Sequence, residues 1–492
     1  MLLAFALVAA GCSRATRPIR VGSKAFVEGV ILGEVAAGLA RRAGVPVEHR
    51  RGLGGTRVLW DALVAGQIDA YPEYTGTIAA ELLAGERVAP GDATALRTAV
   101  ARRGVRMSAE LGFDDTYALG VTRSLAARLG LRRVSDLRAH PALAFGFSHE
   151  FLQRAEGWPG LRARYGLPQT DVRGMQHELA YAALASGAVA ATDVYTTDAE
   201  VAANGLRVLD DDLHHFPPYR AVWLYRADLA RRAPAFVAAL ESMAGRIPTG
   251  TMASLNARAR VERVPEASVA EDFLRDAVGA SGAAPPQEGR AARVWARTKE
   301  HLALVLLSLV AAVLAAVPLG VLVAKRPRAG ALILGAVGLV QTVPSLALLV
   351  FMIPLLGIGA APAVAALFVY GLLPVVRNTA QGIIGIPAAL RESAEVLGLP
   401  PGAILRRVEL PLAAPSILAG VKTAAVINVG TATLGALVGA GGYGEPILTG
   451  IRLAHTPTIL EGAVPAALMA LGAQGLFDLV ERRLVRRPRA AG

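Results

Sequence analysis

Four tyrosines stand in short motifs where their rings could hold a cation. Tyr74 lies in YPEYTGT, Tyr117 in DDTYALG, Tyr195 in DVYTTD and Tyr219 in FPPYRA, and several of them stand at loop positions after strand-like runs. A quaternary ammonium has no N–H to donate, so a selective site surrounds it with aromatic faces, each worth about 0.5–2 kcal/mol. The alternative is that these tyrosines fill the core or its rim.

A second group of residues has the spacing of a docking element. ESAEVLG, from Glu392 to Gly398, is followed nine residues later by VELP, which ends in Leu410 and Pro411. The pattern predicts a short amphipathic helix broken at Gly398, in a helix-turn-helix that fits a partner's groove. The spacing resembles the EAA signature of permease subunits of bacterial ABC importers. That resemblance implies that an ATPase docks here, through Glu392, Ala394, Gly398, Leu410 and Pro411. The alternative is an ordinary polar loop.

Other chemistries have little support. The run LDDDLHH at 209–215 contains carboxylates and imidazoles, but consecutive residues rarely converge on one ion, so we expect no metal. Cys12 is the one cysteine, which excludes a Cys-based zinc site, and no G-x-S-x-G motif is present. No G-x-x-x-x-G-K-[ST] motif occurs either. We therefore expect no enzyme activity and no cofactor in this chain, and ATP hydrolysis in a separate subunit.

The elements that must position these residues fall into two parts of different composition. Apolar residues make up 53% and charged residues 18% of the 492 positions, which excludes both a simple soluble protein and a disordered one. The apolar excess begins after residue 301. Uncharged stretches at 302–324, at 329–376 with a turn at 357–362, at 423–444 and, more weakly, at 462–477 predict five membrane-spanning helices.

The net charge of +12 is also unevenly distributed. Residues 290–492 contain 18 Lys and Arg against 8 Asp and Glu. The basic clusters at 325–328, within 381–413 and at 481–489 all fall on the cytoplasmic side if the preceding domain is external. No basic stripe with interleaved aromatics occurs, so we expect no nucleic-acid partner.

Residues 1–16 read as a targeting segment. MLLAFALVAAGC is an apolar run with small residues before Cys12, and it resembles a bacterial lipoprotein signal. We expect Cys12 to be lipidated and the following domain to be exported. The alternatives are a cleaved signal peptide and an uncleaved anchor.

Residues 17–280 alternate strand-like and helical patterns, as an α/β domain does. Ile19–Ser23 reads as a strand, and the apolar residues Val27, Ile31, Val35 and Leu39 then recur along one helix face. Further strands are predicted in VPVEHR, IDAYPEY, YALGV, ALAFGF, VAATDVY and AVWLYR. The Pro-, Gly- and Arg-rich residues 281–300 read as a linker, and 301–492 as the membrane domain.

Five motifs together resemble one family of transport proteins. VGSKAFVEGVILGE, GLGGTRVLWDAL, IDAYPEYTGT, HEFLQRAEGWPGL and FPPY, within about residues 19–278, resemble the osmoprotectant-binding proteins of glycine betaine/carnitine/choline importers, and residues 302–480 resemble the matching permease subunit. The resemblance implies a two-lobed α/β clamshell (type II periplasmic-binding-protein fold) followed by an all-α permease. It also implies a bacterial inner-membrane protein that works with an ABC ATPase and with a second permease domain, supplied by a second copy in a homodimer or by a paired second permease.

The same resemblance implies roles for individual residues. Tyr74, Tyr117, Tyr195 and Tyr219 would form a cation cage, with the backbone carbonyl of Asp115 facing the ammonium methyls. Lys24, Thr77 and Arg154 would hold a betaine carboxylate, for which Arg supplies a bidentate fork. Four of the 51 basic residues are Lys, so a lysine at position 24 indicates a local requirement. The alternative for Lys24 is a surface residue near a strand end.

Several positions differ from the residues that are most common in the family. Arg220 follows Tyr219, which places a cation near the pocket rim, and His149, Gln153 and Trp158 also differ. These departures leave the ligand open among glycine betaine, proline betaine and carnitine, with choline and ergothioneine as alternatives. The alternative of a membrane-anchored sensor would require a cytoplasmic signalling domain. Roughly a dozen residues follow the predicted fifth span, which is too few for such a domain.

Overall fold

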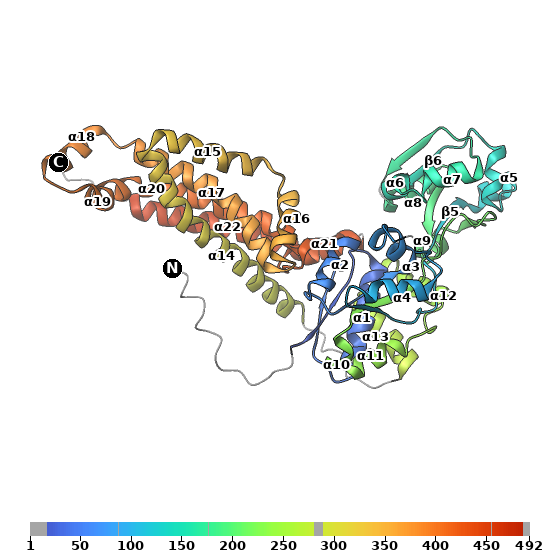
Figure 1. The fold of residues 1–492 in the computed structure, drawn as a ribbon. Coiled ribbons are helices and arrows are strands. Elements are labelled where there is room, and N and C mark those ends of the chain that lie inside the picture. The colour runs from blue at the N-terminus through green and yellow to red at the C-terminus, as the bar shows by residue number, and fades with distance from the viewer. Residues whose placement is uncertain (1–16, 87, 176, 280–288, 454, 486–492) are drawn as a thin grey trace. The chain divides into compact units, whose positions relative to one another are not determined.

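The computed structural model describes residues 17–86, 88–175, 177–279, 289–453 and 455–485. The chain divides near residue 284 into two compact units, an α/β unit and a helical unit (Figure 1). Cys12 lies outside the described residues. The two units are treated separately below.

The first lobe of the α/β unit is built on a five-stranded sheet in the order β2-β1-β3-β10-β4. Its strands are β1 (Ile19–Gly22), β2 (Val47–Arg50), β3 (Ala70–Tyr74), β4 (Val105–Met107) and β10 (Ala221–Arg226). Strands β2, β1 and β3 are parallel, and β10 runs antiparallel to its neighbours β3 and β4. The first sheet therefore contains a strand contributed from far along the chain.

The second lobe repeats this arrangement in the order β7-β6-β8-β5-β9. Its strands are β5 (Tyr117–Thr122), β6 (Phe145–Ser148), β7 (Val172–Met175), β8 (Ala191–Tyr195) and β9 (Leu206–Leu209). Strand β5 is antiparallel to β8 and β9, as β10 is to its neighbours in the first sheet. Two sheets with this topology form the two-lobed α/β fold that the sequence predicts.

Helices cover both sheets. The first lobe carries α1 (Val27–Arg42), α2 (Thr56–Val64), α3 (Thr75–Thr77), the π-helix Ile78–Leu82, α4 (Ala93–Ala101), α10 (Leu229–Arg232), α11 (Pro234–Glu241), α12 (Thr249–Arg260) and α13 (Glu266–Val278). The second carries α5 (Arg123–Leu129), the 3-10 helix Val134–Ala139, α6 (His149–Gln153), α7 (Trp158–Tyr165), α8 (His177–Ala185) and α9 (Ala199–Ala203). Helix α1 is buried on all sides from Val27 to Ala40, because apolar and small residues occupy most of its positions and not one face alone.

The two lobes are joined by two paired segments. Residues 108–116 lead from β4 to β5, and residues 210–220 return from β9 to β10. They run antiparallel at the bridge between Asp114 and Arg220, and the amide of Asp115 donates to the carbonyl of Tyr219 at 3.1 Å. The paired segments therefore form a two-stranded hinge.

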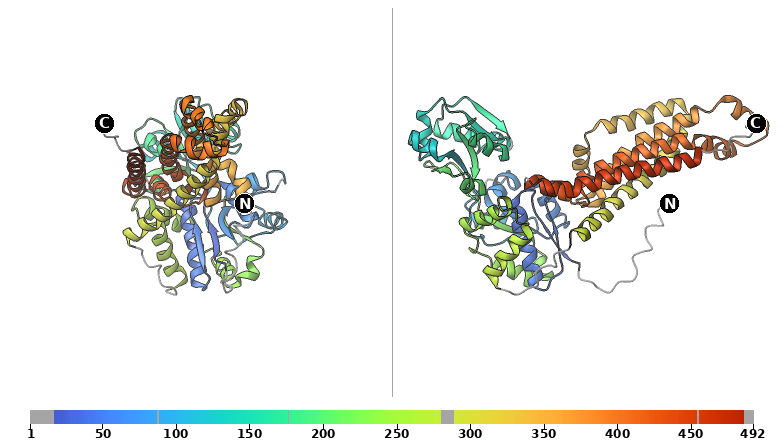
Figure 2. Two further views of the ribbon diagram at one scale, coloured as in Figure 1. Left: turned by 90° about the vertical axis from the view of Figure 1, so that its left-hand side faces the viewer. Right: turned by 180° about the vertical axis from the view of Figure 1, so that it is seen from behind.

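The helical unit contains the long helices that the hydropathy predicts. Its elements are α14 (Arg290–Lys325), α15 (Pro327–Thr342), α16 (Ser345–Leu356), α17 (Ala360–Ile384), α18 (Ala388–Val396), α19 (Pro401–Ile404), the π-helix Leu405–Glu409, α20 (Leu410–Thr431), the 3-10 helix Ala432–Val438, α21 (Gly444–Arg452) and α22 (Thr456–Val485). Helices α14, α17 and α20 pack side by side, and α22 packs on α20 (Figure 2). Among the described residues, four helices are long and apolar enough to cross a membrane, or five if the bent pair α15–α16 is one span.

The helices differ from the predicted spans in two details, and α14 begins within the residues predicted as the linker. The second span is two helices that meet at 99°, where Pro344 prevents the preceding residue from staying helical. Helix α20 of the fourth candidate span begins at Leu410 and not at 423, so Lys422 lies inside α20, where it pairs with Asp478 of α22. Helix α14 begins at Arg290, so the end of the predicted linker is helical. A hydropathy count starts this span after Lys422, because it treats the lysine as a lone charge and cannot include the carboxylate of Asp478 that pairs with it.

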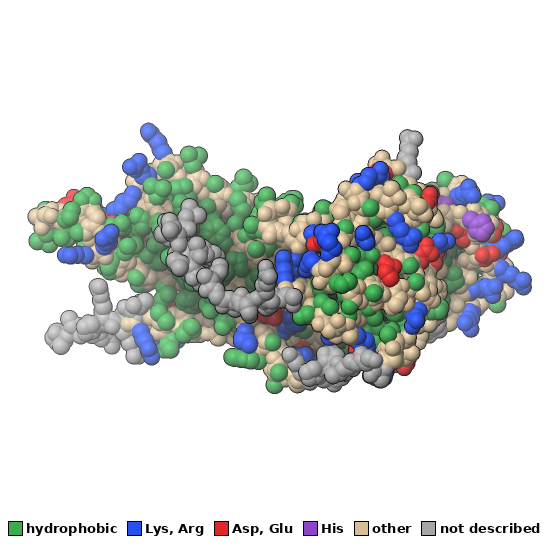
Figure 3. Space-filling model, turned by 60° about the horizontal axis from the view of Figure 1, so that its bottom comes forward, with side chains coloured by type: hydrophobic (Ala, Val, Ile, Leu, Met, Phe, Trp, Pro, Cys, Tyr) green, Lys and Arg blue, Asp and Glu red, His purple; other side chains and the backbone are tan. Residues whose placement is uncertain are grey.

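The surface of the helical unit is apolar. Hydrophobic side chains spread over the face of this unit seen in Figure 3, and Leu332, Leu355 and Leu471 are 66–77% exposed. Exposed apolar area of this extent is unusual for a soluble monomer. It fits a helical unit whose solvent is lipid.

Candidate functional site

Three of the four predicted cage tyrosines lie together at the hinge. The ring of Tyr117 lies 4.8 Å from that of Tyr195 and 6.1 Å, edge to face, from that of Tyr219. The Tyr195 hydroxyl donates to the Tyr117 hydroxyl at 3.0 Å. Phe151 and Phe216 extend the cluster, with centroids 5.2 and 6.2 Å from Tyr117. The three rings form an aromatic wall of the kind that a cation requires.

The backbone explains why these rings meet. Tyr117 begins β5 and Tyr195 ends β8, and the antiparallel register places the two residues opposite one another. Tyr219 reaches the same place from the hinge, where its amide donates to Asp114 Oδ1 at 2.7 Å. Its ring lies so close to Gly76 that a Cβ there would be 2.6 Å away. Glycine in the YTGT motif therefore makes room for the ring.

Tyr74 lies at the end of β3 in the first lobe, beside Lys24 and Phe26. Its hydroxyl donates to Glu28 Oε1 at 2.6 Å, and Lys24 Nζ is 5.7 Å from its ring centroid. Hydrogen bonds through Glu28, Asn256 and Thr197 join it to Asp115. Four cage candidates and Asp115 thus belong to one region of the α/β unit.

The three residues predicted to hold a carboxylate lie in both lobes. Lys24 is buried and pairs with Glu73 Oε1 at 2.5 Å, and Thr77 is buried in α3. Arg154, from the second lobe, lies 5.9 Å from the Tyr117 centroid and 2.7 Å from Glu81 Oε1 of the first lobe. Each cation is therefore next to a cage tyrosine, and each has a protein carboxylate as its present partner.

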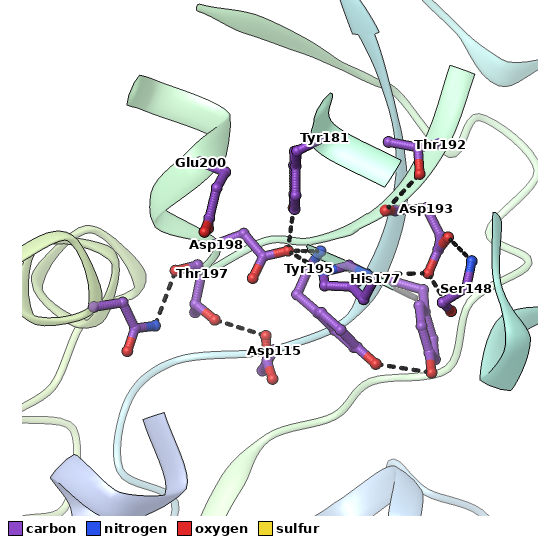
Figure 4. Close-up of polar contacts among 12 residues, drawn as sticks. Asp115, Ser148, His177, Tyr181, Thr192, Asp193, Tyr195, Thr197, Asp198 and Glu200 are labelled. Atoms are coloured by element: carbon purple, nitrogen blue, oxygen red, sulfur yellow. Dashed lines mark hydrogen bonds and ion pairs between the residues drawn. The ribbon is translucent and has the colours of Figure 1, made fainter. Parts of the chain in front are cut away.

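A histidine between two aspartates packs against the ring of Tyr195 (Figure 4). His177 Nε2 lies 3.1 Å from Asp198 Oδ2, its Nδ1 lies 3.5 Å from Asp193 Oδ2, and its ring is 5.1 Å from that of Tyr195. Burial opposes protonation, but the hydrogen bonds and charges of the two aspartates raise the pKa of His177 to about 10. His177 is therefore an imidazolium at neutral pH.

The acidic groups nearest Tyr74 behave differently. Burial, and then the mutual repulsion of Glu28 and Asp115, raises the pKa of Asp115 well above its usual value. Burial also raises the pKa of Glu28, against the hydrogen bonds from Tyr74 and Asn256. These two carboxyl groups are thus destabilised as anions in the unliganded protein.

Other residues that the sequence singles out have structural partners. Asp211 accepts hydrogen bonds from Tyr165 and the amides of His215 and Phe216, so the LDDDLHH run is a loop tied to its own lobe. Among the described residues, no group of three or more His, Cys, Asp and Glu is placed to hold a metal. Arg220 pairs with Glu110 at 3.1 Å, and Trp158 packs on Phe145 and Phe147.

The predicted docking loop has the expected shape. Helix α18 carries Glu392, which is exposed, and Ala394, which is buried. Gly398 follows with φ +74°, and Leu410 and Pro411 begin α20. Between them, the buried Glu409 lies 2.6 Å from Lys325 Nζ and 3.2 Å from Arg391 Nε. The loop is thus fixed to the end of α14.

Sequence reasoning missed Glu28, Asn256, Thr197 and His177. Glu28 could have been noticed, because it is an acidic residue in the first turn of a helix whose other positions are apolar. Asn256 gives no such signal, since its role depends on the approach of α12 to Glu28 and Thr197, which are far away in the sequence.

Comparisons with known proteins agree with the two-part organisation. The model of the substrate-binding domain of the ABC-type glycine betaine transport system matches residues 17–276, and that of the binding-protein-dependent transport system inner membrane component matches residues 316–490. The chain is similar to the choline transport system permease protein OpuBB of Bacillus subtilis, with 43% identity over 38% of this chain and 87% of that protein.

Two further similarities cover one part of the chain each. The osmoprotectant import permease protein OsmW of Salmonella typhimurium is 41% identical over 35% of this chain and 83% of its own length. A crystal structure titled glycine betaine/carnitine/choline ABC transporter is 28% identical, with a TM-score of 0.48, over 52% of this chain and 98% of that one.

Proposed function

The chain belongs to the family of substrate-binding domains of ABC-type glycine betaine transport systems, and from this membership we propose that its α/β unit captures a betaine-type quaternary ammonium compound. The chain joins that domain to a permease domain with several apolar helices, so it is a multi-pass membrane component of an ABC importer for osmoprotectants. The observation that carries the ligand proposal is the contact of the Tyr117, Tyr195 and Tyr219 rings at the hinge.

The proposed site has two ends. The rings of Tyr117, Tyr195 and Tyr219, with Tyr74 in the first lobe, surround the cation, and the Asp115 carbonyl faces its methyl groups. At the other end Lys24, Thr77 and Arg154 hold a carboxylate. Because Lys24 and Arg154 pair with Glu73 and Glu81 here, a bound carboxylate competes with these partners or shares the cations with them.

The proposed mechanism delivers the ligand from outside the cell to the chain's own permease domain. The α/β unit lies on the external side of the inner membrane. Cys12, which is outside the described residues, is the lipid attachment site. A separate ABC ATPase docks on α18 and the turn at Gly398, and a second copy of the chain completes the pathway. Exposed apolar residues on this loop, Val396 at 87% and Leu397 at 78%, support a docking role.

Titration of the purified full-length chain tests the ligand proposal. Calorimetric binding of glycine betaine, proline betaine, carnitine, choline and ergothioneine should give saturable binding of at least one quaternary ammonium ligand, with competition among those that bind. A neutral sugar serves as the control. Absence of binding by all five would refute the proposed function.

A further inference from the structure

A buried polar layer adjoins Tyr74 and continues into the second lobe. Glu28, 4% exposed, accepts from the Tyr74 hydroxyl at 2.6 Å and from Asn256 Nδ2 at 2.9 Å. Asn256 Nδ2 also donates to the Thr197 carbonyl at 3.0 Å, and Thr197 Oγ1 donates to Asp115 Oδ1 at 2.7 Å. Figure 4 shows the contact of Thr197 with Asp115. The layer therefore reaches both sides of the proposed cation cage.

This layer has more acceptors than donors. Two carboxyl groups receive hydrogen bonds from one phenol, one amide and one hydroxyl, and the buried Asn256 Oδ1 has no partner among the described residues. The nearby cations pair with other carboxylates: Lys24 with Glu73, and His177 with Asp193 and Asp198. In the part of the chain that the structure describes, neither Glu28 nor Asp115 has an ion-pair partner.

We propose that the side-chain carboxylates of Glu28 and Asp115 supply the negative charge that reads the ligand's cationic group, and that Glu28 also positions the Tyr74 ring. This inference rests on the proposed function. A quaternary ammonium needs no hydrogen bond, and its single positive charge attracts both carboxylates and offsets one of their two negative charges, in a site where charges interact more strongly than in water. The carboxylate at Glu28 also polarises the phenol of Tyr74 through their hydrogen bond, which strengthens the attraction of the ring for a cation.

The proposal predicts discrimination between two ligands of the same shape. Choline and its neutral isostere, in which a tert-butyl group replaces trimethylammonium, fill the cage equally but differ in charge. The full-length chain is titrated with both at about pH 8. Glu28→Gln, which preserves size, should weaken choline roughly 5- to 30-fold and change the affinity for the neutral isostere less than about twofold.

A matched control is available on the same helix. Glu34 is 3% exposed and pairs with Arg41, His49 and Arg51, so its charge is already compensated. Glu34→Gln should leave the ratio of the two affinities unchanged. Asp115→Asn keeps the backbone carbonyl, should reproduce the loss for choline, and provides an independent measurement if Glu28→Gln does not fold.

The outcomes separate the inference from the function on which it rests. Equal losses for choline and its isostere in both variants would show that these residues only support the structure, and would overturn the inference alone. If the wild-type chain binds no quaternary ammonium ligand, the proposed function fails and this inference fails with it. A selective loss for the cation supports the inference.

Discussion

At the scale of single residues, the proposed site assigns separable tasks to the tyrosines and the cations. The rings of Tyr117, Tyr195 and Tyr219 contact one another, whereas Arg154 contacts Glu81 and Glu150 as well as the Tyr117 face. In the proposed site, a ligand with a carboxylate would contact both the tyrosines and the cations, whereas choline would contact only the tyrosines. Substitutions of the tyrosines should therefore weaken the binding of both kinds of ligand, whereas substitutions of the cations should weaken only ligands with a carboxylate.

Arg154→Ala should weaken a betaine and spare choline. Loss of a charge-assisted hydrogen bond to a buried ion costs about 1.5–3 kcal/mol, which is roughly 10- to 150-fold in affinity. Tyr195→Ala should weaken both ligands, because it removes part of the shared wall. Calorimetry with glycine betaine and choline checks this, and equal losses of the two in Arg154→Ala would assign Arg154 to contact between the lobes.

His177 should stabilise the α/β unit in a pH-dependent way. Its folded pKa of about 10 exceeds the unfolded value of 6.5, so its stabilisation is complete below pH 6.5 and is lost as the pH rises towards 10. His177→Gln should lower the free energy of unfolding more at pH 6 than at pH 10, by a few kcal/mol at about 1.4 kcal/mol per pKa unit, which thermal unfolding at the two pH values measures. His214→Gln, at an exposed histidine, serves as the control, and a difference independent of pH would contradict the assignment.

The sequence predicts the aromatic residues better than the polar layer. The tyrosines occur in short motifs that resemble a family, and the structure brings three of them into contact. Glu28 and Asn256 are 228 positions apart, and their hydrogen bond depends on the packing of α12 against α1. No local pattern records such a contact, which is why sequence reasoning missed it.

At the scale of elements, the strand-like runs of the sequence identify seven of the ten strands in the part of the chain that the structure describes. The missed strands β4, β7 and β9 have three or four residues each, and every one of them exposes an arginine. All three lie at an edge of their sheet, and the exposed arginine interrupts the apolar pattern of each. These strands are held in place by hydrogen bonds to β10, β6 and β5, respectively.

The turn at Gly398 should be sensitive to backbone conformation and not to side-chain size. Its φ of +74° lies in the left-handed region, and a Cβ there would meet no atom within 4 Å. Gly398→Val should therefore strain the loop by about 1–2 kcal/mol, whereas Gly398→Asn tolerates this conformation. Ligand-stimulated ATPase activity of the reconstituted complex should fall more in the Val variant. Equal activity of the two variants would refute the requirement for this turn.

The pair formed by Lys422 and Asp478 should hold α20 against α22. Asp478→Asn removes the partner of Lys422 within a span, so we expect a lower thermal midpoint in detergent. The exchanged variant Lys422→Asp with Asp478→Lys should recover stability, because it restores opposite charges. If the exchanged protein is no more stable than Asp478→Asn, the pair does not contribute to packing.

At the scale of the whole molecule, the bent pair α15–α16 decides the topology. If it crosses the membrane once, the helical unit has five spans, and the basic residues at 325–328, the loop at 385–409 and the C-terminal end share one side. If it re-enters without crossing, four spans remain, and the loop and the C-terminal end move to the side opposite 325–328. The charge distribution favours the first arrangement.

A reporter fused after position 484 distinguishes these two arrangements. If the positive-inside rule holds for the basic cluster at 325–328, this end of α14 is cytoplasmic, and five spans then place both the docking loop and the reporter in the cytoplasm, where an ATPase is available. We expect a fluorescent protein that folds only in the cytoplasm to be active there, and a phosphatase that needs the periplasm to be inactive. A second fusion after position 328 should report the same side. Opposite sides for the two fusions would show that α15–α16 is re-entrant, and would remove the docking loop from the reach of a cytoplasmic ATPase.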